Sequence, residues 1–404
     1  MTAQTADRFR YAERFPLGAA ATIAELERDP HPLLARLRGS EPVSFLPALG
    51  GWLVTRRDLA LAVMRDAEAF TVDDPRFSTA RVVGPSMLSL DGPRHARHRA
   101  PFADGFRPRD THARLAAFIE REAARRVAAL RPHGAAELRR GLAGPLAVAV
   151  VAESLGLRDA RPETVLGWYD AIVGAVSDIS AGREPRSSGA AAFARLGESV
   201  RATVRAGEPD SMLVAAARGG DDWSGLELPE VVSNAAVMLF GGIETTEAMI
   251  TNAALHLLGD PEQPALARAE PARLDDALEE SLRLEPAAAV VDRYATRDVE
   301  LAGAPIRAGD LVIVSLAGAN RDPALFADPD RFDPSRPNAR SHLAFAQGPH
   351  FCLGAHAARL EARAALGALL RELPGLRLDP DRPAPVVRGL VFRKPESLYV
   401  RWDR

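Results

Sequence analysis

Residues 345 to 354 read Phe-Ala-Gln-Gly-Pro-His-Phe-Cys-Leu-Gly, and this stretch decides how the rest of the chain is interpreted. Cys352 is the only cysteine among 404 residues. A long helical pattern follows it, so the thiol is predicted at a helix N-terminus, where free N–H groups and the helix dipole stabilise a thiolate. Gly348 and Gly354 let the backbone come close to a large flat ligand. One thiolate in such a loop suits a single axial bond to haem iron, whereas a lone cysteine by itself is more often a small buried apolar residue.

A second unusual segment lies upstream, where residues 240 to 246 read Phe-Gly-Gly-Ile-Glu-Thr-Thr. They fall in the middle of a predicted helix that begins at Pro229 and ends at Gly259. Two adjacent glycines inside a helix cost about 1 kcal/mol each relative to alanine, so something is expected to approach the backbone there. Taken alone, the segment fits a kinked helix with a solvent-facing glutamate equally well.

Together these segments resemble the cytochrome P450 superfamily. The first is similar to its haem-binding loop, Phe-x-x-Gly-x-His/Arg-x-Cys-x-Gly, and the second to its oxygen-activating motif, Ala/Gly-Gly-x-Asp/Glu-Thr-Thr/Ser. The resemblance implies a mainly α fold of the P450 type, with a large helical domain, a smaller β-rich region, and haem b between a distal and a proximal helix. It implies Cys352 as the axial iron ligand and, around the haem on that side, Phe345, Gly348, His350 and Gly354.

On the distal side, the resemblance implies that Gly241 and Gly242 line an oxygen groove, that Thr245 hydrogen-bonds the oxygen, and that Glu244 relays protons from solvent. Positioned proton transfer of this kind typically contributes about 10²–10⁴ in rate.

The resemblance also assigns the haem propionates and the scaffold. His95, Arg99 and Arg293 are implied as propionate partners together with His350, the alternative for each being ordinary surface charge. Glu280 and Arg283 lie one turn apart on a predicted helix and match the family's structural pair. Arg336 is the candidate third member, although Pro337 follows it where the family often has Phe.

Family position further suggests the substrate pocket. Most of the residues in question are apolar, which implies a small, mainly hydrophobic substrate; they are Met87, Leu88, Met238, Leu239, Ala288, Val290, Val291, Leu390 and Phe392. Asp73, Asp74 or Arg81 would anchor a polar group if their side chains point inward, and the sequence leaves that open.

Composition excludes several other classes. The chain has 51 basic and 54 acidic side chains and a net charge of −3, so no strong field favours nucleic acid or an anionic membrane. Lys394, the only lysine, precedes Pro395 and cannot serve in a phosphate-binding Gly-Lys-Ser/Thr loop. A single cysteine excludes an intramolecular disulfide and an iron–sulfur cluster. No apolar run approaches about 20 residues, so a soluble, cytoplasmic protein is expected.

Apolar residues recur at intervals of three and four, which predicts a largely helical chain. The clearest helices are expected at 115–130, 145–155, 229–258, 273–284 and 353–373. Strands are expected at 43–45 and 51–54 as a hairpin, and at 299–301 in a small sheet with 310–315. Between 320 and 351 the periodicity fails and an irregular, functional stretch is predicted. We expect one domain over 1–404, with the resemblance covering about 30–402 and a lead-in at 1–29.

The resemblance therefore predicts a monooxygenase that inserts one atom of O2 into its substrate by hydroxylation, epoxidation or oxidative dealkylation, in secondary metabolism or catabolism. Electrons are expected from a ferredoxin and its reductase, docked to a monomer through Arg97, Arg107, Arg359 and Arg363. Two alternatives remain open: a peroxide-driven peroxygenase, against which Glu244 and Thr245 argue, and a non-catalytic haem-thiolate sensor.

Overall fold

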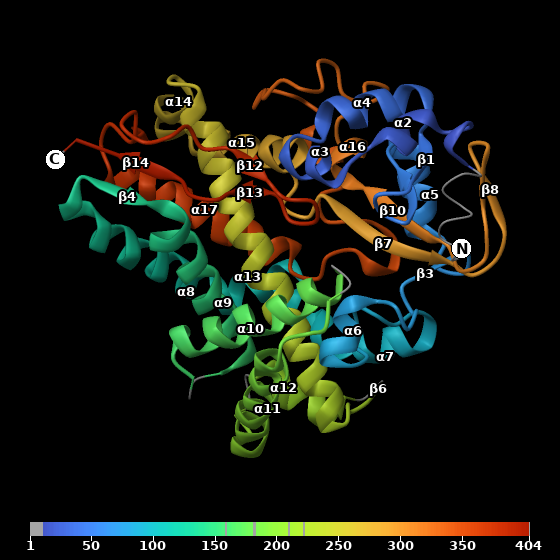
Figure 1. Ribbon diagram of the computed structural model, residues 1–404. Coiled ribbons are helices and arrows are strands. Elements are labelled where there is room, and N and C mark those ends of the chain that lie inside the picture. The colour runs from blue at the N-terminus through green and yellow to red at the C-terminus, as the bar shows by residue number, and fades with distance from the viewer. Residues whose placement is uncertain (1–10, 158–159, 181–182, 209–210, 221–222, 404) are drawn as a thin grey trace.

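A computed structural model describes residues 11–157, 160–180, 183–208, 211–220 and 223–403, so the first ten residues of the predicted lead-in lie outside it. The described chain is mainly helical, as the sequence predicts (Figure 1). The α-helices are α2 (Pro16–Ala20), α3 (Ile23–Arg28), α4 (His31–Ser40), α5 (Arg57–Arg65), α6 (Ser78–Val83), α7 (Gly92–Ala103), α8 (Pro108–Leu130), α9 (Gly144–Leu155), α10 (Pro162–Ser180), α11 (Ser187–Ala206), α12 (Met212–Arg218), α13 (Leu228–Gly259), α14 (Gln263–Ala269), α15 (Pro271–Leu284), α16 (Leu316–Ala319) and α17 (Ala355–Glu372).

Shorter elements complete the chain. The 3₁₀ turns are η1 (Asp104–Phe106), η2 (Arg131–His133), η4 (Ala339–Ser341) and η5 (Gly348–His350), and η3 (Arg139–Ala143) is a π-helix. The strands are β1 (Val43–Leu46), β2 (Gly51–Val54), β3 (Phe70–Thr71), β4 (Ala135–Glu137), β5 (Gly219–Gly220), β6 (Trp223–Ser224), β7 (Val290–Ala295), β8 (Val299–Leu301), β9 (Ala304–Ile306), β10 (Leu311–Ser315), β11 (Arg377–Leu378), β12 (Val387–Arg388), β13 (Lys394–Pro395) and β14 (Tyr399–Arg401).

Helix α13 crosses the middle of the molecule, and Figure 1 shows it in yellow from the lower helices to the upper end. Its start is fixed by a capping box, in which the Glu227 side chain accepts from the backbone of Glu230 and the Glu230 side chain accepts from the backbone of Glu227. Most of its residues are buried on all sides, which is the expected position for a helix with so few polar residues. It packs on α9, α11, α15 and α17.

The main sheet has the strand order β1-β2-β10-β7-β3. The predicted hairpin is present, because β1 and β2 pair antiparallel. The predicted partner of 299–301 is wrong: β8 pairs with β9, and β10 lies between β2 and β7. The reason is local, since Ala302 and Gly303 both have positive φ, 47° and 84°, and form a tight two-residue turn that brings β9 back first.

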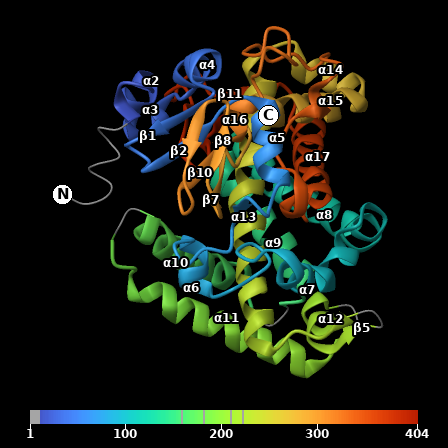
Figure 2. The same ribbon diagram turned by 90° about the vertical axis from the view of Figure 1, so that its right-hand side faces the viewer.

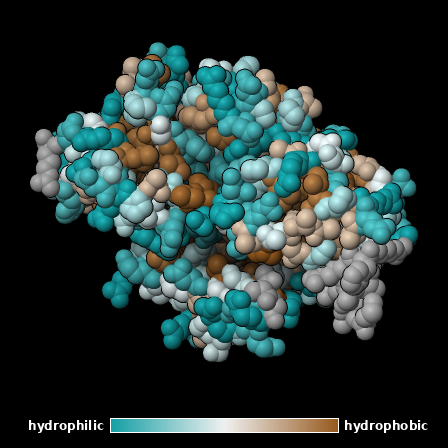
Figure 3. Space-filling view, turned by 45° about the horizontal axis from the view of Figure 1, so that its top comes forward, coloured by the Kyte–Doolittle hydropathy of each residue, from teal (hydrophilic) through white to brown (hydrophobic). Residues whose placement is uncertain are grey.

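Two apolar cores flank α13. One joins it to α8, α15 and α17, and the other joins it to α9, α10 and α11 (Figure 2). Smaller clusters pack around the main sheet. On the face shown in Figure 3, hydrophilic residues cover most of the surface and apolar residues gather in recesses between them. In the described part of the chain, no helix combines the length and apolar character needed to cross a membrane.

Candidate active site

The cysteine loop is built tightly against α5. Gly348 has φ +76°, and a Cβ atom there would lie 2.3 Å from the carbonyl oxygen of Met64, so both its conformation and its surroundings require glycine. The Cys352 N–H donates to the Phe345 carbonyl at 2.9 Å and closes the loop. The Cys352 side chain is exposed to an internal cavity, and α17 begins three residues later at Ala355. Burial raises the pKa of the Cys352 thiol, against the opposing effect of the Gly354 N–H and the Arg99 and Arg359 charges.

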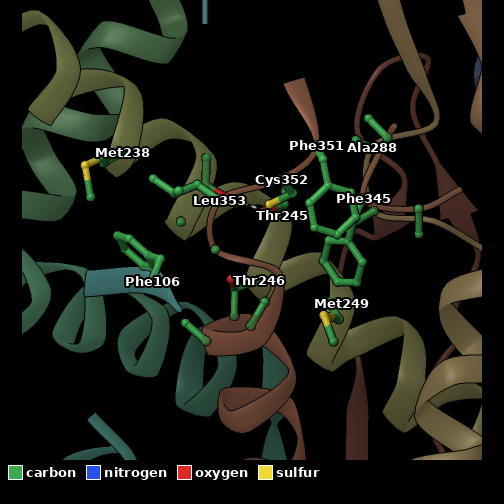
Figure 4. Close-up of a pocket in the computed structure, with 18 of the residues that line it drawn as sticks. Phe106, Met238, Thr245, Thr246, Met249, Ala288, Phe345, Phe351, Cys352 and Leu353 are labelled. Atoms are coloured by element: carbon green, nitrogen blue, oxygen red, sulfur yellow. Dashed lines mark hydrogen bonds between the residues drawn. The ribbon is translucent and has the colours of Figure 1, made fainter. Parts of the chain in front are cut away.

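Helix α13 forms the facing wall of the same cavity, to which it contributes Gly241, Gly242 and Thr245 (Figure 4). A Cβ at Gly241 would meet nothing within 4 Å, whereas one at Gly242 would lie 2.9 Å from the side chain of Val151 on α9. Gly242 therefore permits close helix packing, and Gly241 leaves room beside Thr245. The Thr245 hydroxyl donates to the Gly241 carbonyl within the helix.

A polar cluster lies beside the cysteine loop. His350 contacts Asp91 at 2.8 Å, its ring lies 4.4 Å from that of His95, and Arg99 donates to the Phe351 carbonyl at 2.6 Å. Burial works against ionisation of Asp91, but hydrogen bonds from His350, Thr71 and Val72 lower its pKa overall.

Two basic side chains near this loop, His95 and Arg293, each keep a buried nitrogen without a hydrogen-bond partner in the part of the chain that the structure describes. Burial, followed by the charges of His350 and Arg99, lowers the pKa of His95 to about 4. Its Nε2 atom and one terminal nitrogen of Arg293 are buried without a hydrogen-bond partner among the described residues. His95 and Arg99 thus lie beside His350. Arg293 is close enough for its charge to act on His350 and for that of Asp91 to act on Arg293.

The cavity, together with its opening to solvent, holds about 1400 Å³ of space not filled by atoms. Figure 4 shows Met238, Thr245, Thr246 and Met249 of α13 on its wall, with Phe345 and Cys352 from the loop. Of the nine predicted pocket residues, five line it: Met87, Leu88, Met238, Ala288 and Val291.

The other four predicted pocket residues lie outside the lining, for geometrical reasons. Leu239 is one helical step from Met238, about 100° around α13, and packs into the core with α9 and α10. Val290 alternates with Val291 along β7 and so faces the other side. Leu390 packs in that same cluster, and the Phe392 ring meets the Phe240 ring edge to face, with the ring centres 5.3 Å apart.

The residues present fit a haem. The sulfur of Cys352 faces the cavity, and Gly241 and Gly242 of α13 line the same cavity, as do His350 and Arg99. His95 and Arg293 lie outside the lining, but each keeps a buried nitrogen without a partner among the residues described, which matches an anionic propionate. When bound, the haem supplies oxygen activation, which an axial thiolate promotes by donating electron density. In the described residues, no group of three His, Cys, Asp or Glu side chains is placed to hold a metal ion instead.

Comparison with known proteins agrees with this geometry. The family model described as cytochrome P450 matches residues 198–397. The cytochrome P450 monooxygenase PikC of Streptomyces venezuelae is 36% identical over 96% of this chain and 94% of that protein. The chain belongs to the cytochrome P450 family. The mycinamicin IV hydroxylase/epoxidase of Micromonospora griseorubida is 34% identical over 91% of this P450 and 94% of its own length. The crystal structure of CalO2 superposes with a TM-score of 0.84 at 30% identity, covering 93% and 96% of the two chains. The protein is thus a haem-thiolate monooxygenase that uses haem and O2.

The predicted scaffold residues of this P450 form one buried cluster. Glu280 accepts from Arg283 Nε at 2.7 Å and from Arg336 Nε at 3.0 Å, and the Glu280 and Arg283 side chains are fully buried. Arg283 also donates to the carbonyls of Asn320, Pro329 and Arg331, so the cluster ties α15 to the irregular stretch before the cysteine loop.

Glu244, the acid next to Thr245, takes part in a network of ion pairs and hydrogen bonds that the sequence did not predict. Lys394 of β13 lies 2.6 Å from Glu244 and also pairs with Glu247, one turn further along α13. The Tyr169 hydroxyl of α10 donates to Glu244, and Arg139 pairs with Glu247 at 3.1 Å. Burial opposes ionisation of Glu244, but the Lys394 charge and these hydrogen bonds lower its pKa overall.

Glu361 of α17 was also missed. It is buried, it lines the cavity, and one of its carboxyl oxygens has no partner in the described part of the chain. Burial raises the pKa of Glu361 well above its usual value, so the neutral acid is favoured. A glutamate among alanines on a predicted helix gave no signal that could separate this side chain from a solvent-facing one.

Proposed function

We propose that this P450 inserts one oxygen atom of O2 into a small, neutral, mainly hydrophobic secondary metabolite, by hydroxylation, epoxidation or oxidative dealkylation. The observation that carries the proposal is that Thr245 and Cys352 line one cavity from opposite elements, α13 and the cysteine loop. A hydroxyl group at that place serves oxygen activation and has no use in a sensor. The mycinamicin relative, whose name gives hydroxylation and epoxidation, supports the reaction class.

The lining supports a neutral substrate. Its distal residues are apolar, including Met87, Met238 and Val291. Asp73 pairs with Arg94 at 3.1 Å, and Asp74 pairs with Arg76 at 2.8 Å, so neither carboxylate is unpaired and available to a basic substrate group. Binding is therefore expected to rest on buried apolar area rather than on an ion pair.

For electrons we propose a ferredoxin and its reductase, acting on a monomer. Of the predicted docking residues, Arg97, Arg107 and Arg363 are at least partly exposed but pair with Glu230, Asp104 and Asp275. Because each charge is partly balanced, docking would depend on a competing acidic surface displacing these weak surface pairs.

The proposed role of Thr245 predicts that Thr245→Ala uncouples the reaction. Without the hydroxyl, protons are not delivered at the cavity wall, so reductant is consumed and hydrogen peroxide leaves. Product formed per reduced nicotinamide should fall about tenfold or more, within the range for positioned proton transfer. Product, peroxide and nicotinamide are measured in one assay, with Thr245→Ser as the control that keeps the hydroxyl. Strong turnover on added peroxide that Thr245→Ala leaves unchanged would favour the peroxygenase alternative.

A second prediction concerns the ion pair of Glu244. Lys394→Met removes the charge that favours the Glu244 carboxylate, so the pKa of Glu244 should rise. If Glu244 relays protons, the inflection in the pH profile of coupled product formation moves to higher pH. Lys394→Arg, which keeps the charge, should hold the inflection near its original position. An unmoved inflection in Lys394→Met would mean that Glu244 does not limit proton delivery.

A further inference from the structure

Arg359 has a place in the structure that the sequence did not predict. Its guanidinium is turned inward, where it donates to Glu279 of α15 from Nε at 2.5 Å and from Nη2 at 3.0 Å. Glu279 is buried, and its two-point contact with Arg359 matches the forked geometry of a guanidinium. Such a contact fixes the orientation of Arg359 and makes it a poor candidate for docking another protein.

Glu279 is itself held from a second direction. His342 lies 3.1 Å from it through Nε2, while the Nδ1 of His342 accepts from the Ala344 N–H at 3.1 Å. The backbone donor thus assigns the His342 proton to Nε2, which donates to Glu279. Burial alone would raise the pKa of Glu279, but the bonds from His342 and Arg359 lower it to about 2. The carboxylate is a fixed negative charge that orients Arg359.

The other side of the guanidinium meets the cysteine loop. The central carbon of Arg359 lies 4.5 Å from the centre of the Phe345 ring, within the range of a cation–π contact. Phe345 lines the cavity, and its carbonyl accepts the Cys352 N–H. One aromatic side chain therefore joins Arg359 to the backbone that positions the sulfur.

We propose that Arg359, oriented by Glu279, is a positioning residue that fixes Phe345 and places a positive charge beside the thiolate, and that this charge raises the reduction potential of the haem iron. In the Arg359–Glu279 pair, the guanidinium contacts Phe345 and therefore faces the cysteine loop. The sulfur of Cys352 then experiences a net positive potential from the pair. A positive charge favours the state that carries one more electron. Residues outside the ligand set tune metal centres in this way. The inference rests on haem-thiolate ligation and does not depend on the proposed electron donor.

The same two helices supply a matched control. Arg363 follows Arg359 by one turn of α17, and Asp275 precedes Glu279 by one turn of α15; they pair at 3.3 Å. Arg363 is 53% exposed, compared with 29% for Arg359. The second pair repeats the charges and spacing of the first but lies nearer solvent, so its effect on the iron should be screened.

The test is a spectroscopic redox titration of the haem-loaded protein with chemical mediators, without ferredoxin. Arg359→Met should lower the ratio of reduced to oxidised protein at fixed potential roughly threefold or more, and Glu279→Gln should raise that ratio, because it removes the balancing negative charge. Arg363→Met and Asp275→Asn should leave it unchanged. The reduced carbon-monoxide complex of each variant is recorded to show that thiolate ligation persists.

Opposite shifts in the two variants are the decisive result, because a loss of packing alone would move both in one direction. The proposal is overturned if Arg359→Met keeps the long-wavelength band of thiolate ligation and the wild-type ratio, or if both variants shift alike. Should Arg359→Met fail to hold haem, Arg359→Lys replaces it: the charge remains without the fork, so its ratio should lie near wild type. An effect of Arg363→Met equal to that of Arg359→Met would assign the shift to general surface charge.

Discussion

Replacing Glu280 by alanine is expected to unfold most of the haem-binding core. The substitution leaves Arg283, which is fully buried, and Arg336, which is nearly so, without their shared carboxylate. It also removes the acceptor of the Asp333 N–H at 3.0 Å. Removing one partner of a buried ion pair typically costs about 3–5 kcal/mol, which is a large part of the roughly 5–15 kcal/mol that stabilises a folded domain. Because the cluster ties α15 to the stretch that precedes the cysteine loop, haem binding should fail with the fold.

The measurement is the midpoint of denaturant unfolding together with haem content per chain. Glu270→Ala is the matched control, since Glu270 and Arg273 form a pair with the same spacing at the start of the same helix. Both side chains are largely exposed, so Glu270→Ala should lower the free energy of unfolding by less than about 1 kcal/mol. If both variants lost the same amount of unfolding free energy, burial of the Glu280 cluster would not explain its contribution to stability.

What the sequence could predict was local. The helix ranges follow from periodicity, and differences at their ends follow from caps: α8 begins at Pro108, earlier than expected, because proline suits the first turn. Strand pairing depended on turns of one or two residues. The two-residue turn Ala302–Gly303 pairs β8 with β9. From sequence the turn was overlooked, because the β pattern of 310–315 is stronger than that of β9.

Partners of the site residues could not be predicted, because they come from distant segments. Lys394 reaches Glu244 and Glu247 across about 150 residues of chain, a contact that only the fold creates. Asp91 lies four residues before His95 in the sequence, but no sequence pattern links it to His350, which it contacts in the fold. Arg359 was expected among the arginines that dock the electron donor, but it pairs with the buried Glu279 and its side chain is only 29% exposed.

Cys352→Ser is expected to abolish monooxygenation and the long-wavelength Soret band of the reduced carbon-monoxide complex, with little loss of folded structure. Serine nearly preserves the size of the side chain, and the loop is held by its own bonds, the Cys352 N–H to the Phe345 carbonyl and the packing of Gly348 on Met64. The chain has no second cysteine to replace the ligand.

Cys352→Met separates the effect of charge from that of sulfur. A thioether can bind iron but has no negative charge to donate, so the band and the activity should be lost in this variant too. Circular dichroism checks that both variants remain folded. A retained band in Cys352→Ser would mean that another group ligates the iron, and retained activity in Cys352→Met would mean that the anionic charge is not what drives oxygen activation.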